Sequence, residues 1–141
     1  MKKNALESVD LFLKYCFIAI LIVAALAFFF VFTINWEDWF FGIKLDGTAA
    51  GIYLLIKGLC AAVLLYLIFR YPRFIEYLAV SGAIYLGFLF IDSTVTVQRL
   101  SSGRQSFSVL LGLFAIIPIV FLVVHKIVKR RDLSATGNES L

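Results

Sequence analysis

Lys57 is the residue with the strongest claim on chemistry, because it lies inside an otherwise apolar run of the chain. A charged side chain within a membrane is costly and is a functional hypothesis by default. Asp92 stands near the end of the next apolar run and supplies an opposite charge. Two tyrosines, Tyr53 and Tyr85, flank the same stretch. We therefore expect a candidate intramembrane polar site formed by Lys57, Asp92, Tyr53 and Tyr85.

Two interpretations of this site stay open. Lys57 is about eight residues into its run, which places it roughly 12 Å deep at about 1.5 Å per helical residue. Its stem can recover several ångströms by extending toward the surface. In the structural interpretation, a Lys57–Asp92 pair or an extended lysine fixes the rotation of the helix. In the functional interpretation, Lys57 lines a site for an ion, a proton or an anionic substrate.

Other familiar chemistry is absent from the sequence. His125 has no second histidine and no carboxylate or cysteine cluster beside it, so no metal site is expected. No Ser-His-Asp set, glycine-rich phosphate loop or catalytic carboxylate pair can be assembled. Cys16 and Cys60 do not form a Cys-x-x-Cys pair, and we expect free, buried thiols. The sequence predicts a non-enzymatic protein without a cofactor.

Composition places these residues in a membrane protein. The chain has 141 residues, of which 62% are hydrophobic and 16% are charged, whereas a soluble domain is about half apolar and a quarter charged. The apolar residues form blocks of about twenty, the length that crosses a bilayer as a helix. We predict an all-α fold, a four-transmembrane-helix bundle with short loops in a single domain, residues 1–131. The expected spans are residues 11–34, 49–69, 74–95 and 106–128.

The connecting segments carry further expectations. Residues 35–47 contain Trp36 and Trp39 and are predicted as an interfacial segment of one or two helical turns, with the tryptophans as anchors. This segment is either an aromatic belt, which fixes the depth of the helices, or a docking surface or a lid over a cavity. Residues 70–73 form a tight basic hairpin, and residues 96–105 form a loop of turn-forming residues. Pro118 is expected to bend the fourth span, and the polar tail, residues 132–141, to be disordered.

Small residues predict where the helices approach one another. In lipid, helices associate where small side chains let their backbones come close. Ala79, Ala83 and Gly87 recur every four residues and so share one helix face. With Gly58 and Gly112, they are the predicted helix-packing positions. The Phe-rich stretch 28–32 is expected to face lipid or another subunit.

Cationic residues predict the orientation, because cytoplasmic segments of membrane proteins are enriched in lysine and arginine. Nine cations flank the two termini and the central hairpin, and three flank the opposite side. Both termini are therefore predicted to be cytoplasmic. The cations expected at lipid headgroups are Arg70, Arg73, Lys126, Lys129, Arg130 and Arg131. Because the positive residues lie at the ends of the apolar runs, we assign the excess positive charge to contacts with the membrane. We therefore expect no nucleic-acid partner.

In size, number of spans and the basic hairpin Arg70-Tyr71-Pro72-Arg73, the chain resembles several small bacterial membrane families, among them the phosphate-starvation-inducible E proteins. The resemblance is one of layout and transfers no site residue. From the residues themselves we expect a small integral membrane subunit of a prokaryotic inner membrane. It would act by assembly, with itself or as an accessory or sensor component with another membrane or cytoplasmic protein. The alternative is a small oligomeric transporter or channel with a path lined by Lys57.

Overall fold

The computed structural model describes residues 5–34, 36–100 and 105–138. These residues form four long helices, α1 (Ala5–Ile34), α2 (Gly47–Arg70), α3 (Ile75–Leu100) and α4 (Gln105–Asn138). Two short strands, β1 (Glu37–Phe40) and β2 (Ile43–Asp46), join α1 to α2, and a 3-10 turn, η1 (Pro72–Phe74), joins α2 to α3. Within the described ranges, each of the four helices is long and apolar enough to cross a membrane. The predicted helical class and four membrane-length segments are confirmed.

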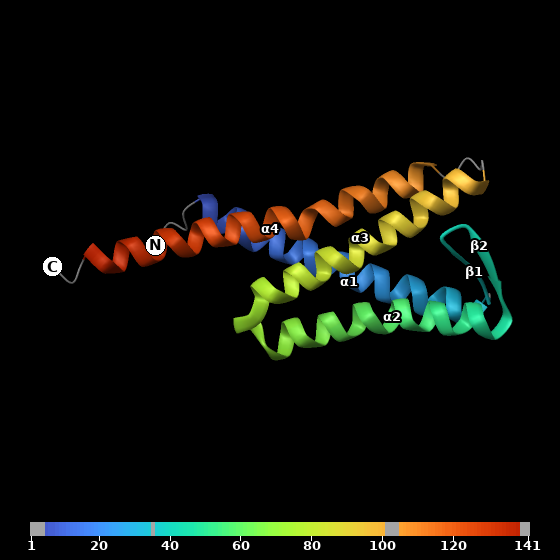
Figure 1. Cartoon of the computed structure of the whole chain (residues 1–141). Coiled ribbons are helices and arrows are strands. Elements are labelled where there is room, and N and C mark those ends of the chain that lie inside the picture. Colours follow the sequence, from blue (N-terminus) through green and yellow to red (C-terminus); the bar gives the residue numbers. More distant parts are fainter. Residues whose placement is uncertain (1–4, 35, 101–104, 139–141) are drawn as a thin grey trace.

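α1 packs along α2 and α3 packs along α4, whereas α2 and α3 diverge from their shared turn toward the hairpin end (Figure 1). A core of fully buried side chains joins all four, with Phe17 and Leu21 from α1, Ile68 from α2, Ala79 from α3 and Phe121 from α4. The rings of Phe17 and Phe121 stack with their centroids 6.4 Å apart. The start of α1, the end of α4 and the α2–α3 turn lie toward one end of the molecule, and the strands lie at the other (Figure 1).

The segment after α1 is a β-hairpin, so the prediction of one or two helical turns there is wrong. β1 and β2 pair antiparallel, with Phe40 opposite Ile43 and Trp39 opposite Lys44. Phe41 and Gly42 form the two-residue turn and both have positive φ, 46° and 79°. Turns with positive φ at both central residues match the twist of paired strands and favour glycine there. A segment this short gains little as an isolated helix, whereas its aromatic and branched residues suit a strand.

Three of the helices are clearly longer than predicted, and the first of them, α1, begins at Ala5 rather than at residue 11. α3 continues to Leu100, so part of the expected 96–105 loop is helical, and residues 101–104 lie outside the described residues. α4 continues to Asn138, so the prediction of a disordered tail is wrong for residues 132–138. Lysine, arginine, leucine and alanine favour helix, and no proline interrupts them after Pro118. Pro118 itself is buried within α4.

The predicted packing positions behave differently from one another. A methyl group at Gly58 would touch the Phe29 ring of α1 at 3.3 Å, and one at Gly112 would meet the Phe90 ring of α3 at 2.8 Å. Ala79 is fully buried, whereas Ala83 is partly covered. Gly87 makes no close approach, because a methyl group there would meet nothing within 4 Å.

The tightest contact involves a glycine that the seam pattern did not select. A methyl group at Gly82 would lie 2.3 Å from the Phe17 ring, which is fully buried. α3 therefore turns the helix face that carries Gly82 toward Phe17 of α1, and not the face that carries Gly87. The phenylalanines 28 and 29 also turn inward in part, against the expectation that this stretch faces lipid. Cys16 and Cys60 are free, but Cys60 is exposed and Cys16 only half-buried, so the expectation of buried thiols is wrong.

These two glycines give a matched pair of substitutions. Gly82→Ala should lower the free energy of unfolding by about 1–3 kcal/mol, because the enclosed Phe17 ring cannot move aside freely. Gly87→Ala should leave stability unchanged or raise it by up to about 1 kcal/mol through helix propensity. Reversible unfolding in mixed micelles, followed by circular dichroism, measures both. Equal effects of the two substitutions would contradict the close contact between Gly82 and the Phe17 ring.

Candidate functional site

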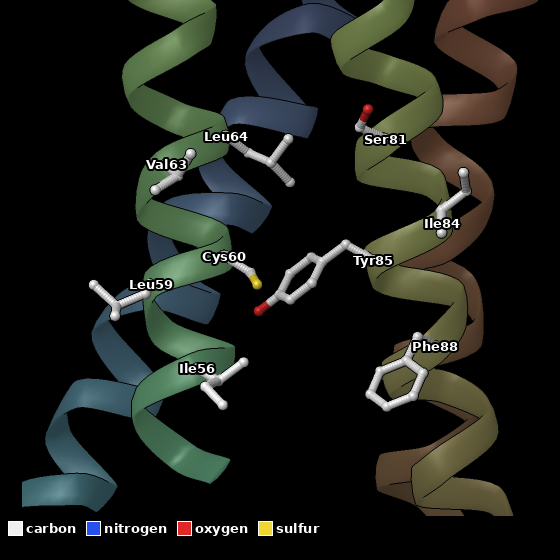
Figure 2. A pocket seen from close by; sticks show the side chains of 9 residues that line it. All are labelled: Ile56, Leu59, Cys60, Val63, Leu64, Ser81, Ile84, Tyr85 and Phe88. Atoms are coloured by element: carbon white, nitrogen blue, oxygen red, sulfur yellow. The ribbon is translucent and has the colours of Figure 1, made fainter. Parts of the chain in front are cut away.

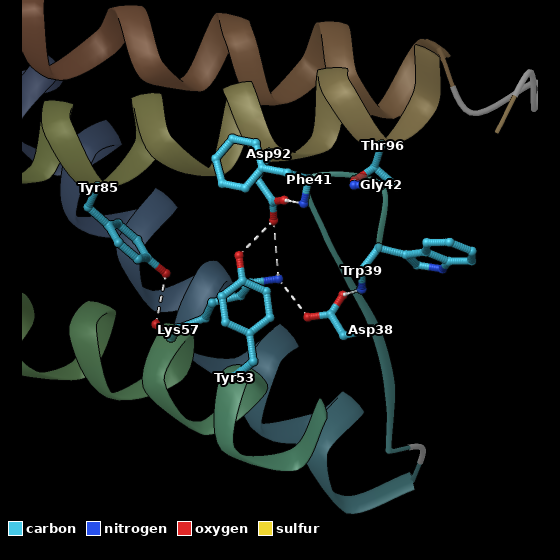
Figure 3. A network of polar contacts seen from close by, with 9 residues as sticks. All are labelled: Asp38, Trp39, Phe41, Gly42, Tyr53, Lys57, Tyr85, Asp92 and Thr96. Carbon is cyan, nitrogen blue, oxygen red and sulfur yellow. Dashed lines mark hydrogen bonds and ion pairs between the residues drawn. The ribbon is translucent and has the colours of Figure 1, made fainter. Parts of the chain in front are cut away.

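The Lys57 ammonium is enclosed by groups from four segments of the chain, α1, the hairpin, α2 and α3, and Figure 3 shows the last three. Lys57 Nζ donates to Asp38 Oδ2 of the hairpin at 2.6 Å and lies 3.7 Å from Asp92 Oδ2 of α3. It also lies 4.0 Å from the centroid of the Tyr53 ring and 5.3 Å from that of Phe28. Cations over aromatic faces are attracted by the ring quadrupole. We call Asp38, Tyr53, Lys57 and Asp92 the Lys57 cluster.

Asp92 organises the other half of the cluster. Its Oδ1 accepts a hydrogen bond from the Phe41 backbone N–H at 2.6 Å, and its Oδ2 accepts one from the Tyr53 hydroxyl at 2.8 Å. The side chain is 6% exposed, and that of Lys57 is 8% exposed. Asp92 thereby joins α3 to α2 and to the tip of the hairpin (Figure 3). The carboxylate is satisfied by donors of this chain.

The hairpin turn is shaped to make this contact. Phe41 has a left-handed backbone at φ 46°, which is costly for a residue with a side chain. Its N–H is fixed by Asp92, and the next N–H, that of Gly42, donates to Thr96 Oγ1 at 3.1 Å. The Phe41 ring packs edge-on against Phe40 and Phe88. The hydrogen bonds that two residues on one face of α3 accept from the turn, together with these ring contacts, offset the backbone strain.

Tyr85 takes a different position from the one expected. Its hydroxyl donates to the Lys57 backbone carbonyl at 2.9 Å, and in Figure 3 its ring is drawn apart from the Lys57 ammonium. It crosses from α3 to α2 without joining the charged groups. Of the four predicted site residues, the structure brings Lys57, Asp92 and Tyr53 together. Tyr85 contacts only the backbone carbonyl of Lys57 and not its ammonium.

The charges of the cluster do not balance. Two carboxylates share one ammonium, so the fully ionised cluster carries one net negative charge. Asp38 Oδ1 accepts from the Trp39 N–H at 2.8 Å, which adds a donor to the second carboxylate. Buried charges are tolerated when they are paired and hydrogen-bonded, and removing one partner is strongly destabilising. The Lys57 cluster therefore restricts the positions of the hairpin, α2 and α3 relative to one another.

The other predicted residues lie at the two ends of the helices. Trp36 stacks on Phe32, donates from its indole N–H to the Phe32 carbonyl at 2.8 Å and covers Gly51 at the start of α2. Trp39 points away from the Lys57 cluster (Figure 3). At the opposite end, Lys129 donates to Glu76 at 2.6 Å. The other five cations expected at headgroups are all exposed, namely Arg70, Arg73, Lys126, Arg130 and Arg131.

A second polar contact near that end was not expected. His125 Nδ1 lies 3.1 Å from Asp10 Oδ2, joining α4 to α1, and the His125 ring contacts Phe121. Among the described residues, no group of three or more histidine, cysteine, aspartate or glutamate side chains is arranged to hold a metal ion. The chemistry of this contact is that of a helix-to-helix hydrogen bond, charged only when the histidine is protonated.

Sequence reasoning missed one member of the Lys57 cluster, Asp38, and the neighbouring ring of Phe28. Asp38 was grouped with the interfacial segment, because its distance from Lys57 depends on the chain reversing at Phe41-Gly42. Gly42, followed by the alternating apolar and charged residues 43–46, is the signal that could have indicated a hairpin, although Phe41 stands where such turns usually have asparagine, aspartate or glycine. Phe28 gave no signal, since nothing in the sequence distinguishes it from the phenylalanines that follow.

Comparison of this chain with models of known protein families, with curated proteins and with solved structures finds no match.

Two aspartates allow the role of the cluster to be tested. Asp92→Ala removes the acceptors of the Phe41 N–H and the Tyr53 hydroxyl, and each donor left buried and unpaired costs about 1–3 kcal/mol. We expect the hairpin to be cleaved faster by protease in limited proteolysis. Asp46→Ala is the control, since Asp46 also pairs with a lysine but is 63% exposed, where such pairs contribute about 0–1 kcal/mol. Wild-type resistance in Asp92→Ala would show that Asp92 does not hold the hairpin.

Proposed function

We propose that this protein is a small, non-enzymatic integral membrane subunit that acts by assembly, with copies of itself or as an accessory or sensor component of a larger membrane complex. The observation that carries the proposal is the enclosure of Lys57. Its ammonium is met by two carboxylates and two aromatic rings of the same chain, and its side chain is 8% exposed. A lysine that lined a path would present its charge to that path.

The surfaces of the chain support assembly. Large apolar side chains stand exposed along all four helices, for example Phe30 at 66%, Val63 at 53%, Ile84 at 69% and Val123 at 56%. The hairpin, outside the membrane-length helices, exposes Ile43 and Phe40 as well. Exposed apolar groups in a protein mark contacts with lipid or with partners. Those on the hairpin suit a partner, because that segment is joined to the helices through the Lys57 cluster.

The proposed setting is a prokaryotic inner membrane that the four helices cross as a bundle, with both termini in the cytoplasm. The α2–α3 turn carries Arg70 and Arg73, and the end of α4 carries Lys129, Arg130 and Arg131. These cations gather toward one end of the molecule (Figure 1). The hairpin end carries acidic Glu37, Asp38 and Asp46 around Lys44. The positive-inside rule assigns the basic end to the cytoplasm.

A second candidate function is a small oligomeric transporter or channel with a path lined by Lys57. One observation favours it: the cluster has two carboxylates for one ammonium. A proton or a cation would complete its charge, and intramembrane carboxylates mark ion pathways in many membrane proteins.

Lys57→Met distinguishes these functions. If the lysine is structural, its loss leaves two carboxylates uncompensated, and breaking a buried pair of this kind costs about 3–5 kcal/mol. We expect lower stability and altered assembly, measured by unfolding and native mass spectrometry, with any loss of activity following the loss of folded protein. Lys44→Met is the control, because Lys44 is exposed on the hairpin. A variant that folds and assembles normally but loses ion flux in liposomes would establish the path.

The mass of the intact complex tests assembly directly. The wild-type protein, extracted gently from its own membrane without overexpression, should carry further copies or other subunits at fixed stoichiometry. A companion protein would establish an accessory or sensor role. A homo-oligomer with ion flux that depends on Lys57 would favour the channel, and a monomer would overturn the proposal of assembly.

A further inference from the structure

We propose that the groove between α2 and α3 holds one hydrocarbon chain of an anionic membrane lipid, whose phosphate lies at Arg70 and Arg73. This inference rests on the membrane placement above but not on the assembly. The groove has a volume of about 700 Å³, with Ile56, Cys60 and Val63 on one wall and Ile84, Tyr85 and Phe88 on the other. Figure 2 shows the side chains of Ile56, Cys60 and Tyr85 pointing into the space between the two helices.

The groove is fixed at both ends. Toward the turn, Leu64 and Ile68 of α2 belong to the same buried core as Ile75 and Leu78 of α3. Toward the hairpin, Tyr53 of α2 donates to Asp92 of α3. Between these points the Tyr85 ring reaches across from α3, with its hydroxyl on the Lys57 carbonyl (Figure 2). α2 and α3 are thereby joined on both sides of the opening, and the Tyr85 ring between them keeps the two helices from moving together.

The chemistry of the walls requires an apolar occupant. The hydroxyl of Tyr85 is bonded to the Lys57 carbonyl, and that of Ser81 is bonded to the Tyr77 carbonyl at 3.1 Å. The Cys60 thiol is only a weak donor. A polar ligand would find few partners in the groove, and its desolvation would be uncompensated.

The size of the groove argues for a lipid chain and against a protein partner. Nine residues line it, whereas a stable protein interface uses about 20–30 residues on each side. Its length, from Ile56 to Leu64, is about 12 Å at about 1.5 Å per residue. A flexible hydrocarbon chain can enter an opening closed at both ends, whereas a partner helix about 10 Å across would only lie over it.

Charge complementarity indicates an anionic headgroup. Val63, Tyr66 and Arg70 are spaced three and four residues apart, so one face of α2 leads from the groove to Arg70, about 10 Å along the helix. Arg73 lies in the turn η1, two residues before α3 begins. In the described part of the chain, neither arginine forms an ion pair, and nearby Glu76 is bonded to Lys129. Arginine recognises phosphate through bidentate hydrogen bonds.

The chain supplies an internal control. A second apolar hollow of about 650 Å³ lies on α1, lined by residues that include Val23, Leu26 and Phe30. No basic residue stands in the last turn of α1. It should therefore contact lipid chains without a preference for anionic lipids.

The test uses the full-length protein in phosphatidylcholine nanodiscs with a trace of photoactivatable phosphatidylglycerol or photoactivatable phosphatidylcholine, each with a diazirine in its acyl chain. Cross-links are mapped by mass spectrometry. We expect the anionic probe to label the α2–α3 groove more than the α1 hollow, on the order of tenfold for two arginines. The zwitterionic probe should label the two sites similarly.

Two variants test the headgroup and the chain separately. Arg70→Gln with Arg73→Gln should remove the anionic preference, whereas Arg130→Gln with Arg131→Gln should retain it. Cys60→Trp fills the groove from an exposed position and should remove groove labelling while sparing the α1 hollow. Equal anionic labelling of both hollows, a preference that survives the arginine substitutions, or a groove covered by a second copy would overturn the proposal. The mass of the complex is measured in parallel, so failure of lipid binding is distinguishable from failure of assembly.

Discussion

The structure depends on the burial of one ammonium group. In a low-dielectric interior Lys57 requires counter-charges close at hand, and these come from segments that are far apart in the sequence. Asp38 brings the hairpin to α2, and Asp92 brings α3 to both. Phe41 keeps its costly left-handed backbone because its N–H donates a hydrogen bond to the Asp92 carboxylate. The charge therefore determines the path of the chain between α1 and α2.

The contacts around Lys57 also explain why α2 and α3 are separated between their two ends. α2 and α3 are joined by a tight turn at one end and by the Tyr53–Asp92 hydrogen bond at the other. Between these points the Lys57 carbonyl is engaged by Tyr85, whose ring occupies the gap. α1 and α4 pack on the opposite side through Phe17 and Phe121. The apolar groove is thus a consequence of how the polar contacts hold the two helices.

The sequence predicted what depends on composition and local spacing, and missed what depends on chain reversal. Apolar runs of about twenty residues defined the helices, and the isolated charges Lys57 and Asp92 identified two members of the cluster. Asp38 could not be assigned, because its approach to Lys57 requires the Phe41-Gly42 turn. The packing seam was predicted at Gly87, whereas the close contact is at Gly82. The spacing of small residues does not determine how a helix is rotated; here the Phe17 ring does, because it packs on Gly82. The helical tail was missed, because polar composition alone does not distinguish a solvated helix from a coil.

The two ends of the molecule are held by interactions of different strength. At the hairpin end the charges are buried, so separating them exposes unpaired groups to a low dielectric. At the other end Lys129, paired with Glu76, has a side chain that is 62% exposed, and pairs of that kind contribute about 0–1 kcal/mol. The Asp10–His125 contact there is ionic only while the histidine is protonated. The hairpin is consequently joined to α2 and α3 through buried polar contacts. At the basic end the polar pairs are easily exchanged for water or for lipid phosphate, and the helices are held together there by the buried apolar core around Phe17, Ile68 and Phe121.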